Sequence, residues 1–347
     1  MTTAFLTDTR FLEHDEPGHP EFSGRLKSVW QKLDAAALRP RMLELAPKAA
    51  SEHTILLAHT RQLLNRLGEI EAMNNGNYNV RVDADTYMSP KSYTIARIAA
   101  GAICDAVDAV LDGEADNALC AVRPPGHHAT PDRAMGFCLL NNIAIGARHA
   151  QSVHNLKRVM IVDYDVHHGN GTQDIFYSDP SVLFVSTHQY PLYPGTGWLE
   201  ETGEGAGEGY TLNIPMPAKC GDANYAAVFE QVIWPAAQRY QPELIMVSAG
   251  FDAHWGDPLA GMNLTLAGYT HLTRELIRMA QTLCEGKIVF VMEGGYNLEA
   301  IGAGVANIAH CLLGDDAIID PLGAAPKTEE PNIAPLIETL RQLHGLA

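Results

Sequence analysis

Short apolar runs alternate along the chain with longer segments of helical periodicity. The runs, several of them rich in Val and Ile, are Ala118–Val122, Val159–Val162, Val182–Val185, Leu244–Val247 and Ile288–Met292. Short runs of this kind, flanked by polar residues or glycine, are typical of strands buried on both faces. Between them, apolar residues recur three and four positions apart, which predicts helices over 95–111, 139–153, 222–238, 266–283 and 297–312. The alternation predicts an α/β fold, a mostly parallel sheet with helices on both faces.

The pattern continues without an internal repeat or a linker, so we expect one domain over residues 1–347. Its core would lie at about 1–315, and a C-terminal loop and short helix would occupy 316–347. The segment 320–332 has few large apolar residues and is predicted to be a loop.

The composition fits a globular protein, since 46% of the 347 residues are hydrophobic and 19% are charged. The first residues, MTTAFLTDTRFLEHDE, lack the basic start and apolar stretch of a signal peptide. The sequence has no uninterrupted apolar stretch of about 18 residues, so we expect no membrane span and a cytoplasmic protein. The six cysteines include no CxxC pair and are expected to be free thiols.

The chain is strongly acidic, with 41 Asp and Glu against 24 Lys and Arg and a formal net charge of −17. Such a surface repels nucleic acid and attracts cationic partners at low salt. Two interpretations stay open. The charge serves solubility alone, or it draws in a cationic substrate such as a basic protein tail or a polyamine.

Chemically active residues follow four of the predicted strands. RPPGHH ends in His127 and His128, DYDVHHGNG contains Asp163, Asp165 and His167, SAGFDAHWGD contains Asp252, and EGGYN contains Tyr296. Ligands of open parallel sheets bind beyond the carboxyl ends of the strands. Four such ends on one edge therefore predict a shared active site.

Asp165, His167 and Asp252 are the candidate metal ligands. Residues i and i+2 of an extended segment point the same way, so Asp165 and His167 can reach one ion. Two carboxylates and one imidazole leave positions open for water and substrate, which is typical of a catalytic zinc site. The same set suits Fe(II), Co(II) or Mn(II), so the spacing leaves the metal open. A DxH motif by itself is also compatible with an ordinary surface loop.

The adjacent histidines are candidate acid–base groups, because an imidazole can take a proton from water and return it to a leaving amine. Asp163 and Asn170 are the candidate partners that fix the tautomers of His127 and His128. An Asp raises the basicity of a histidine more than a neutral Asn does. Tyr296, after two glycines, could donate to a developing oxyanion, although a buried tyrosine with a purely structural role is an equal alternative.

With these residues in place, the chain resembles the histone deacetylase family, which has the arginase/deacetylase fold. The matching motifs are RPPGHHAT (123–130), GFCLLNN (136–142), VDYDVHHGNGTQ (162–173), YPGTG (193–197), SAGFDAHWGDPL (248–259) and EGGYN (293–297). The resemblance extends from HPEFSGRL at 19–26 to about residue 312. Because class I enzymes carry Asp at the position of Asn170, the chain is similar to the class II branch and to bacterial deacetylase-like amidohydrolases.

The resemblance implies one catalytic Zn²⁺ on Asp165, His167 and Asp252. It implies His128 as general base and acid, backed by Asn170, and His127 as its electrostatic partner, backed by Asp163. Tyr296 would polarise the scissile carbonyl. The family also implies one or two K⁺ ions, one at Asp163, Asp165, His167, Ser186 and Thr187, and another at Phe176, Asp179, Val182 and Tyr210.

By the same resemblance, five residues would bind substrate. Phe137 and Tyr193 match the aromatic pair around the acyl-lysine chain, Gly136 faces the substrate amide, Asp85 lies at the rim, and Leu259 follows GDP. Arg25 matches an arginine near an internal product channel. The expected activity is removal of acyl groups from N-acyl-lysine or similar acylated amines, with homo-oligomerisation left open.

Three competing hypotheses remain. The first is an acetylpolyamine amidohydrolase, whose class II members carry Glu where this chain has Leu259. The second is a binuclear manganese ureohydrolase, which needs further Asp and His ligands where this chain has HH and Tyr. The third is an inactive binding module on the same fold. The presence of a suitable residue at every expected catalytic position argues against this hypothesis.

Overall fold

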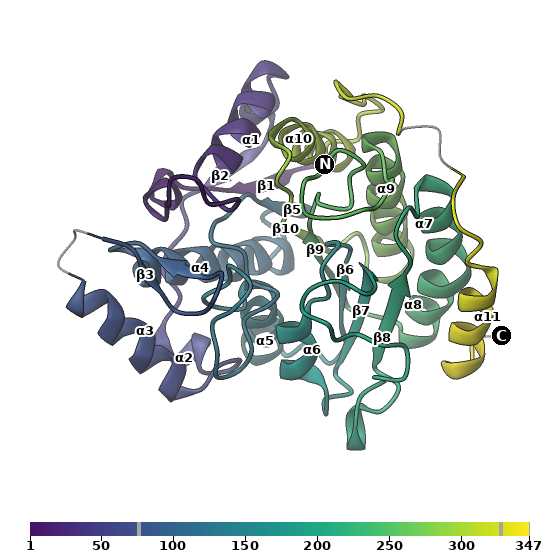
Figure 1. Ribbon diagram of the computed structural model, residues 1–347, viewed down its shortest axis with the longest axis horizontal. Coiled ribbons are helices and arrows are strands. Elements are labelled where there is room, and N and C mark those ends of the chain that lie inside the picture. Colours follow the sequence, from purple (N-terminus) through teal and green to yellow (C-terminus); the bar gives the residue numbers. More distant parts are fainter. Residues whose placement is uncertain (75–77, 326–328, 347) are drawn as a thin grey trace.

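A parallel sheet of eight strands forms the centre of the computed structural model, which describes residues 1–74, 78–325 and 329–346 (Figure 1). The strand order is β2-β1-β5-β10-β9-β6-β7-β8. A small antiparallel hairpin, β3–β4, lies outside this sheet. The strands are β1 Thr3–Leu6, β2 Leu43–Leu45, β3 Val80–Arg81, β4 Tyr87–Met88, β5 Asn117–Cys120, β6 Val159–Asp163, β7 Val182–Gln189, β8 Thr211–Met216, β9 Leu244–Ala249 and β10 Ile288–Met292.

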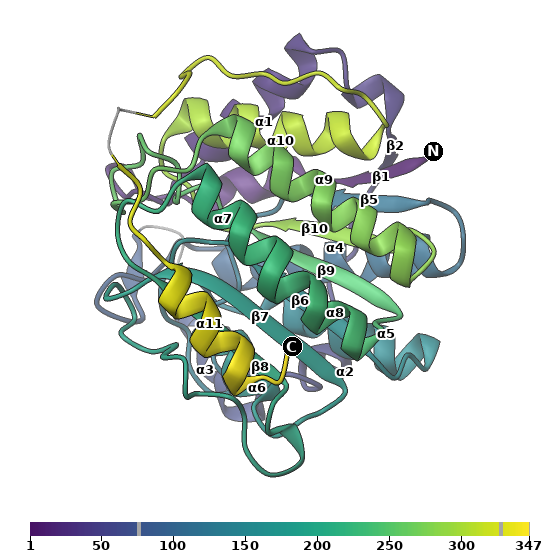
Figure 2. The ribbon, with the colours of Figure 1, turned by 90° about the vertical axis from the view of Figure 1, so that its right-hand side faces the viewer.

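Helices cover both faces of the sheet (Figure 2). One face carries α1 Gly24–Ala35, α7 Asp222–Val228, η4 Phe229–Ile233, α8 Trp234–Tyr240, α9 Leu266–Leu283, α10 Leu298–Leu312 and α11 Ala334–Leu343. The other carries α2 Glu52–Ile55, α3 Arg61–Met73, α4 Ser92–Leu111, α5 Asn142–His154 and α6 Asn170–Phe176. Short 3₁₀ turns occur at η1 Thr9–Glu13, η2 Arg39–Arg41 and η3 Gly205–Gly207. The predicted two-faced α/β architecture is confirmed.

The five predicted strands all form, and β7 continues four residues past its apolar run to Gln189. The helix predicted over 222–238 is interrupted instead of continuous. A π-helical segment, η4, separates α7 from α8, and Pro235 follows at the start of α8. Proline lacks the N–H that continues an α-helical ladder, so a local change of helix type there is expected. Within the predicted loop 320–332, residues 326–328 lie outside the described residues, and α11 follows it.

The register of the central strands sets the position of the functional residues. Asp163, the last residue of β6, pairs with Ser186 of β7 on one side and with Ser248 of β9 on the other. The segments that follow β6 and β9 therefore leave the sheet at the same level. All five residues of β6 are buried, so this edge is built on a rigid, fully packed base.

Helix caps fix where the neighbouring loops end. The Asn141 side chain accepts a hydrogen bond from the Ala144 N–H at the start of α5, and Asn297 does the same for Glu299 and Ala300 at the start of α10. These residues end the loops that contain the predicted histidine pair and Tyr296. An Asn at the N-cap satisfies amide groups that the helix cannot pair itself.

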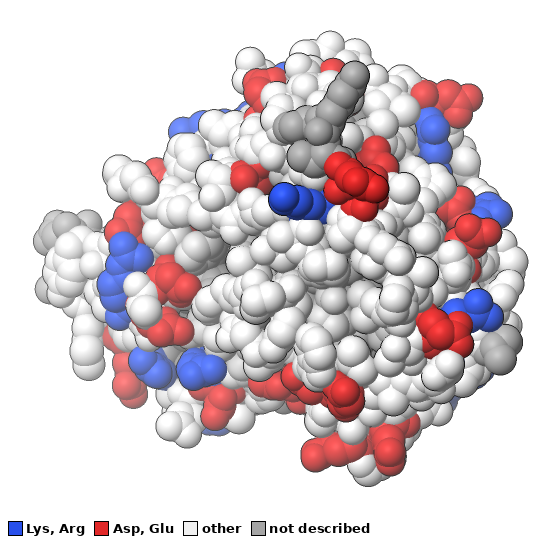
Figure 3. Space-filling model, turned by 45° about the vertical axis from the view of Figure 1, so that its right-hand side comes forward, with Lys and Arg blue, Asp and Glu red and all other residues white. Residues whose placement is uncertain are grey.

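Figure 3 shows acidic side chains around the margin of one face and a broad central area with few charged residues. Among residues 1–74, 78–325 and 329–346, no helix combines the length and the apolar character needed to cross a bilayer.

Candidate active site

Asp165, His167 and Asp252 come together at the carboxyl edge of the sheet, as predicted. His167 Nδ1 lies 3.3 Å from Asp165 Oδ1 and 3.1 Å from Asp252 Oδ2. All three residues are buried, and their potential ligand atoms lie within 4.8 Å of one another. Two facing buried carboxylates are costly without a compensating cation. The chemistry of the donor set and its burial therefore fit a divalent metal ion.

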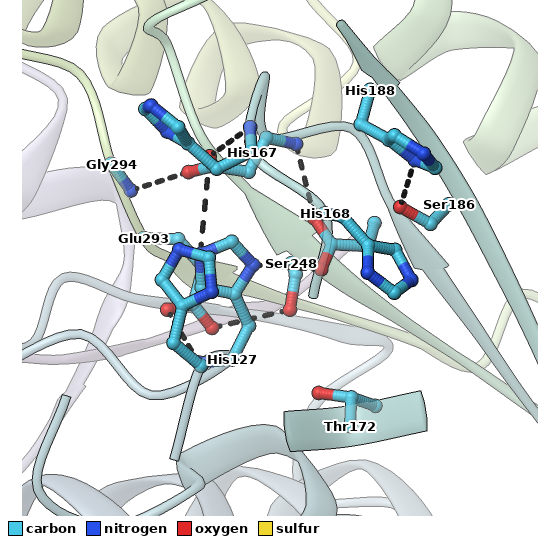
Figure 4. Close-up of polar contacts among 12 residues, drawn as sticks. His127, His167, His168, Thr172, Ser186, His188, Ser248, Glu293 and Gly294 are labelled. Carbon is cyan, nitrogen blue, oxygen red and sulfur yellow. Dashed lines mark hydrogen bonds and ion pairs between the residues drawn. The ribbon is translucent and has the colours of Figure 1, made fainter. Parts of the chain in front are cut away.

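Main-chain N–H groups hold both carboxylates in place. Asp252 Oδ1 accepts from Val166 N at 2.9 Å, and Asp165 Oδ2 accepts from Gly294 N at 2.8 Å. Gly294 is required for this approach, since a Cβ there would lie 2.3 Å from Asp252 Oδ2. These two hydrogen bonds tie together the loops that follow β6, β9 and β10, and Figure 4 draws the bond that Gly294 donates.

The two adjacent histidines have different partners. His127 Nδ1 lies 2.9 Å from Asp163 Oδ2, and His128 Nδ1 lies 2.8 Å from Asn170 Oδ1. Their ring centroids are 4.0 Å apart. The tight turn that brings them together depends on Gly126, where a Cβ would lie 2.5 Å from Asn142 N. The structure thus contains both predicted contacts, one between a carboxylate and the His127 ring and one between an amide and the His128 ring.

These partners have opposite effects on the two rings. Burial lowers the pKa of His127, but the negative charges of Asp163 and Asp165 outweigh burial and raise that pKa to about 10. Burial, followed by the positive charges of His127 and His167, lowers the pKa of His128 well below its ordinary value. The arrangement favours a charged His127 beside a neutral His128.

A pocket of about 220 Å³ opens above these groups. It brings together all five predicted substrate-binding residues with His128, His167 and Tyr296. Its lining is Asp85, His128, Gly136, Phe137, His167, Leu192, Tyr193, Leu259 and Tyr296.

A larger cavity of about 650 Å³ lies at the amino end of the sheet, between Pro180, Tyr210 and His344. That cavity contains none of the predicted catalytic residues.

Aromatic rings form two walls of the pocket. Tyr193 meets the ring of His128 edge-on at 5.1 Å, and Phe137 meets Tyr296 edge-on at 5.8 Å. Gly136 and Phe137 both have positive φ angles, 57° and 68°. At Gly136 a Cβ would lie 2.5 Å from the His128 ring, so only glycine fits there.

Asp257 is a functional candidate that the sequence analysis missed. One carboxylate oxygen accepts from Tyr296 N at 2.7 Å and from Asn297 N at 3.2 Å, and the other accepts from Leu259 N at 2.9 Å. Burial raises the pKa of Asp257 to about 7. The residue stands in the GDPL motif, but its role rests on main-chain contacts that the sequence pattern does not show.

Glu293 is a second missed residue, in the EGGYN motif. Its Oε2 accepts from Gly126 N at 2.7 Å and from His127 N at 3.3 Å, and Ser248 Oγ donates to Oε1 at 3.1 Å. Figure 4 shows Glu293 beside His127 and Ser248. Glu293 thus attaches the PPGHH turn to the ends of β9 and β10.

Arg25 lies behind Tyr296 and is completely buried. Its guanidinium carbon is 5.0 Å from the centre of the Tyr296 ring, and its Nε donates to the Gly295 carbonyl at 2.7 Å. Glu21 pairs with Arg25 at 3.0 Å and also binds Arg123, so one buried carboxylate lies between two buried guanidinium groups.

The residues of the first predicted potassium set lie together around the end of β6, where Asp163 pairs with Ser186. Thr187 Oγ1 is buried there without a hydrogen-bond partner in the described structure. In the second set, the Asp179 carboxylate already binds Arg148 and Ser181, and the Arg148 guanidinium lies 4.5 Å from the centre of the Phe176 ring. The positively charged Arg148 guanidinium therefore already lies beside the residues of the second potassium set.

Fold and site together define a hydrolase of the parallel α/β type with a candidate metal centre at the carboxyl edge. Residues 19–312 match the family model described as histone deacetylase domain. "Histone deacetylase 14, chloroplastic" of Arabidopsis thaliana is 42% identical over 320 residues, which cover 88% of this chain and 76% of that protein. "Polyamine deacetylase HDAC10" of Homo sapiens is 39% identical over 321 residues, covering 90% of this chain and 47% of that protein.

A solved structure, "Crystal Structure of HDA15 HD domain", superposes with a TM-score of 0.90 at 35% identity. The superposition covers 99% of this chain and 94% of the other. The chain belongs to the histone deacetylase family and is a deacetylase-type amidohydrolase with the arginase/deacetylase fold. The resemblance inferred from the sequence motifs is confirmed.

Proposed function

We propose that this chain is a zinc-dependent deacylase that hydrolyses N-acyl-lysine or a similar acylated amine. The observation that carries the proposal is the pocket whose lining brings together the candidate metal ligand His167, His128 and Tyr296. Asp165, His167 and Asp252 would hold the ion. When bound, Zn²⁺ would supply Lewis-acid chemistry that polarises the amide carbonyl and activates the attacking water.

His128 is the proposed general base and acid. Because the Asn170 oxygen accepts from Nδ1, the proton of neutral His128 is on Nδ1 and Nε2 is free to accept another. Nε2 would take the proton of the attacking water and later deliver it to the amine as the C–N bond breaks. The products would be a carboxylate and an amine.

His127 is the proposed electrostatic partner. Asp163 stabilises its charged form, and that charge lies 4.0 Å from the His128 ring, measured between centroids. A permanent positive charge at this distance disfavours protonation of His128 before the reaction and favours developing negative charge on the substrate oxygen.

Tyr296 is the proposed donor to that oxygen. Asp257 fixes its main-chain N–H, and Arg25 stands against its ring, so the side chain has little freedom to turn away. Gly136, Phe137, Tyr193, Asp85 and Leu259 would hold the acyl chain and its linker, because they line the same narrow pocket.

Turnover of a panel of acetyl-lysine peptides, other acyl-lysine peptides and acetylated putrescine and spermidine tests the proposal, using enzyme whose zinc content has been measured. We expect acyl-lysine peptides to be hydrolysed and hydroxamates to inhibit. The absence of turnover for every acylated amine by fully zinc-loaded enzyme would refute the proposal.

Acetylpolyamines are the second candidate substrates. The formal net charge of −17 and the similarity to a protein named polyamine deacetylase favour a cationic substrate. The apolar Leu259 in the pocket lining offers no charge to the amine of a polyamine, whereas Asp85 does. A higher kcat/KM for acetylspermidine than for every acetyl-lysine peptide would establish this alternative.

We also propose a structural K⁺ at the set that contains Asp163, Asp165, His167, Ser186 and Thr187. The unpartnered, buried Thr187 hydroxyl supports this, because buried polar atoms otherwise find a partner. The second set, at Phe176, Asp179, Val182 and Tyr210, has weaker support because Arg148 already neutralises Asp179.

A reducing cytoplasm is the proposed compartment. All six cysteines are buried and unpaired. Free thiols of this kind persist where disulfides do not form.

A further inference from the structure

Two histidines and an aspartate meet at the opposite edge of the sheet from the catalytic pocket. Asp108 belongs to α4, and His149 and His154 belong to α5, which packs alongside α4 (Figure 1). Both helices run back from the carboxyl edge to the amino edge of the parallel sheet. Their carboxyl ends therefore lie far from the loops that carry Asp165 and Asp252.

The two imidazoles converge on one atom. His149 Nε2 and His154 Nε2 each lie 2.7 Å from Asp108 Oδ1. The histidine side chains are only 14% and 15% exposed, so packing fixes their orientation, while Asp108 at 39% leaves the cluster open to solvent. One donor atom from each of these residues fits around a single ion.

Two further carboxylates lie close to this cluster. Asp105 and Asp112 lie one turn from Asp108 along the sequence, and Asp112 Oδ1 is 3.8 Å from His154 Nδ1. A carboxylate near the second ring nitrogen is the usual outer partner of a metal-bound histidine. Within the described ranges, no Lys or Arg side chain pairs with these three carboxylates at ion-pair distance.

We propose that Asp108, His149 and His154 form a second metal site, for a divalent transition ion such as Zn²⁺, that joins the ends of α4 and α5. Zn–N and Zn–O bonds of about 2.1 Å place tetrahedral ligands about 3.4 Å apart, so each present contact of 2.7 Å would open by about 0.7 Å. The exposed Asp108 carboxylate can make that adjustment. Water would complete the coordination.

The alternative is that both imidazoles only donate hydrogen bonds to Asp108. Asp108→Asn separates the two explanations, because an amide oxygen still accepts hydrogen bonds but is a poor zinc ligand. His149→Ala/His154→Ala removes both nitrogen ligands. His53→Ala/His271→Ala is the matched control, because both of those histidines are exposed and lie on other helices.

The experiment measures zinc per chain by mass spectrometry after equilibrium dialysis of the full chain in excess Zn²⁺, together with turnover of an acetyl-lysine peptide and the Tm. We expect two zinc ions in the wild type and control, one in Asp108→Asn and in His149→Ala/His154→Ala, and equal turnover in all four. Zinc should raise the Tm of the wild type and control above that of the two variants. Asp112→Asn should weaken the second site about 10- to 100-fold.

One zinc per wild-type chain, or two in His149→Ala/His154→Ala, would overturn the proposal. The second of these results would show that the second ion binds elsewhere on the chain. Neither Asp108→Asn nor His149→Ala/His154→Ala changes a residue of the catalytic pocket. If the second metal site proved wrong, the proposed deacylase activity would therefore still be measurable and unaffected.

Discussion

Histidines lie at both edges of the sheet, and the two groups are built differently. At the carboxyl edge, His127 and His128 are buried and each ring has its own partner, Asp163 or Asn170. At the amino edge, His149 and His154 are partly exposed and share one oxygen of Asp108. Separate partners in a buried site give adjacent rings different protonation states. A shared partner open to solvent gives equivalent rings that suit a bound cation.

Removing a metal ligand at the carboxyl edge has the largest expected effect. Asp252→Ala should lose the catalytic metal and lower kcat/KM about a thousandfold or more, because the carbonyl and water are no longer polarised. Metal analysis and steady-state kinetics measure both quantities. Full turnover with retained metal stoichiometry would show that Asp252 is not a ligand.

Tyr296→Phe comes next in size. It should keep the metal but lower kcat about 10²- to 10³-fold, because only the donor to the developing oxyanion is removed. The KM should change little by comparison. An unchanged kcat would assign that donor to another group.

Asn170→Asp tests the difference between the two buried histidines directly. A carboxylate beside His128 should raise its pKa by about 1 unit or more, as Asp163 does for His127. The acidic limb of the pH profile of kcat/KM should therefore move to higher pH, with a loss of about tenfold below neutral pH. Asp163→Asn is the matched variant, since it should act on His127 instead. A profile that stays in place would contradict the assignment of His128 as the base.

His59 should affect stability alone, and only at acidic pH. This buried ring lies 2.9 Å from the Thr130 carbonyl and accepts from Asn141 N at 2.8 Å, so it supports the loop that holds the histidine pair. Burial lowers its pKa to about 4. The unfolded chain, with a pKa of about 6.5, binds more protons below that value, so stability is present above pH 6.5 and lost as the pH falls toward 4.

The loss from His59 should reach about 3 kcal/mol of unfolding free energy near pH 4. Denaturant unfolding from pH 7 to pH 4 measures it, with the exposed His53→Gln variant as a control that keeps the full pH dependence. His59→Gln should flatten the dependence over this range. If the unfolding free energy of His59→Gln changed with pH as steeply as that of the wild type, His59 would not contribute to the pH dependence of stability.

The sequence was sufficient to predict the two-faced α/β fold, because strands buried on both faces leave uninterrupted apolar runs such as Val159–Val162. It also indicated which loops meet, since parallel strands place their carboxyl ends on one edge. The interruption at η4 was missed because apolar spacing is nearly the same through an α-helix and a single π turn. Short edge strands such as β2, with three residues, leave too little pattern to recognise.

Within the site, motif residues with their own chemistry could be found, but residues that act through the backbone could not. Asp257 and Glu293 accept hydrogen bonds from main-chain N–H groups of other loops, and that pairing depends on tertiary structure alone. The α4–α5 cluster was missed for the same reason. Asp108 and His149 are 41 positions apart and belong to no motif, so only helix packing brings them together.

The bonds of Asp257 have a consequence for how new specificities can evolve in this enzyme. Its carboxylate holds Leu259 through the main-chain N–H and leaves the side chain free to vary. The same carboxylate holds the backbone of Tyr296. A mutation at position 259 can therefore exchange an apolar wall for a charged or smaller one in a single step, while the tyrosine keeps its position. Such an arrangement allows related enzymes to diverge in substrate without passing through an inactive ancestor.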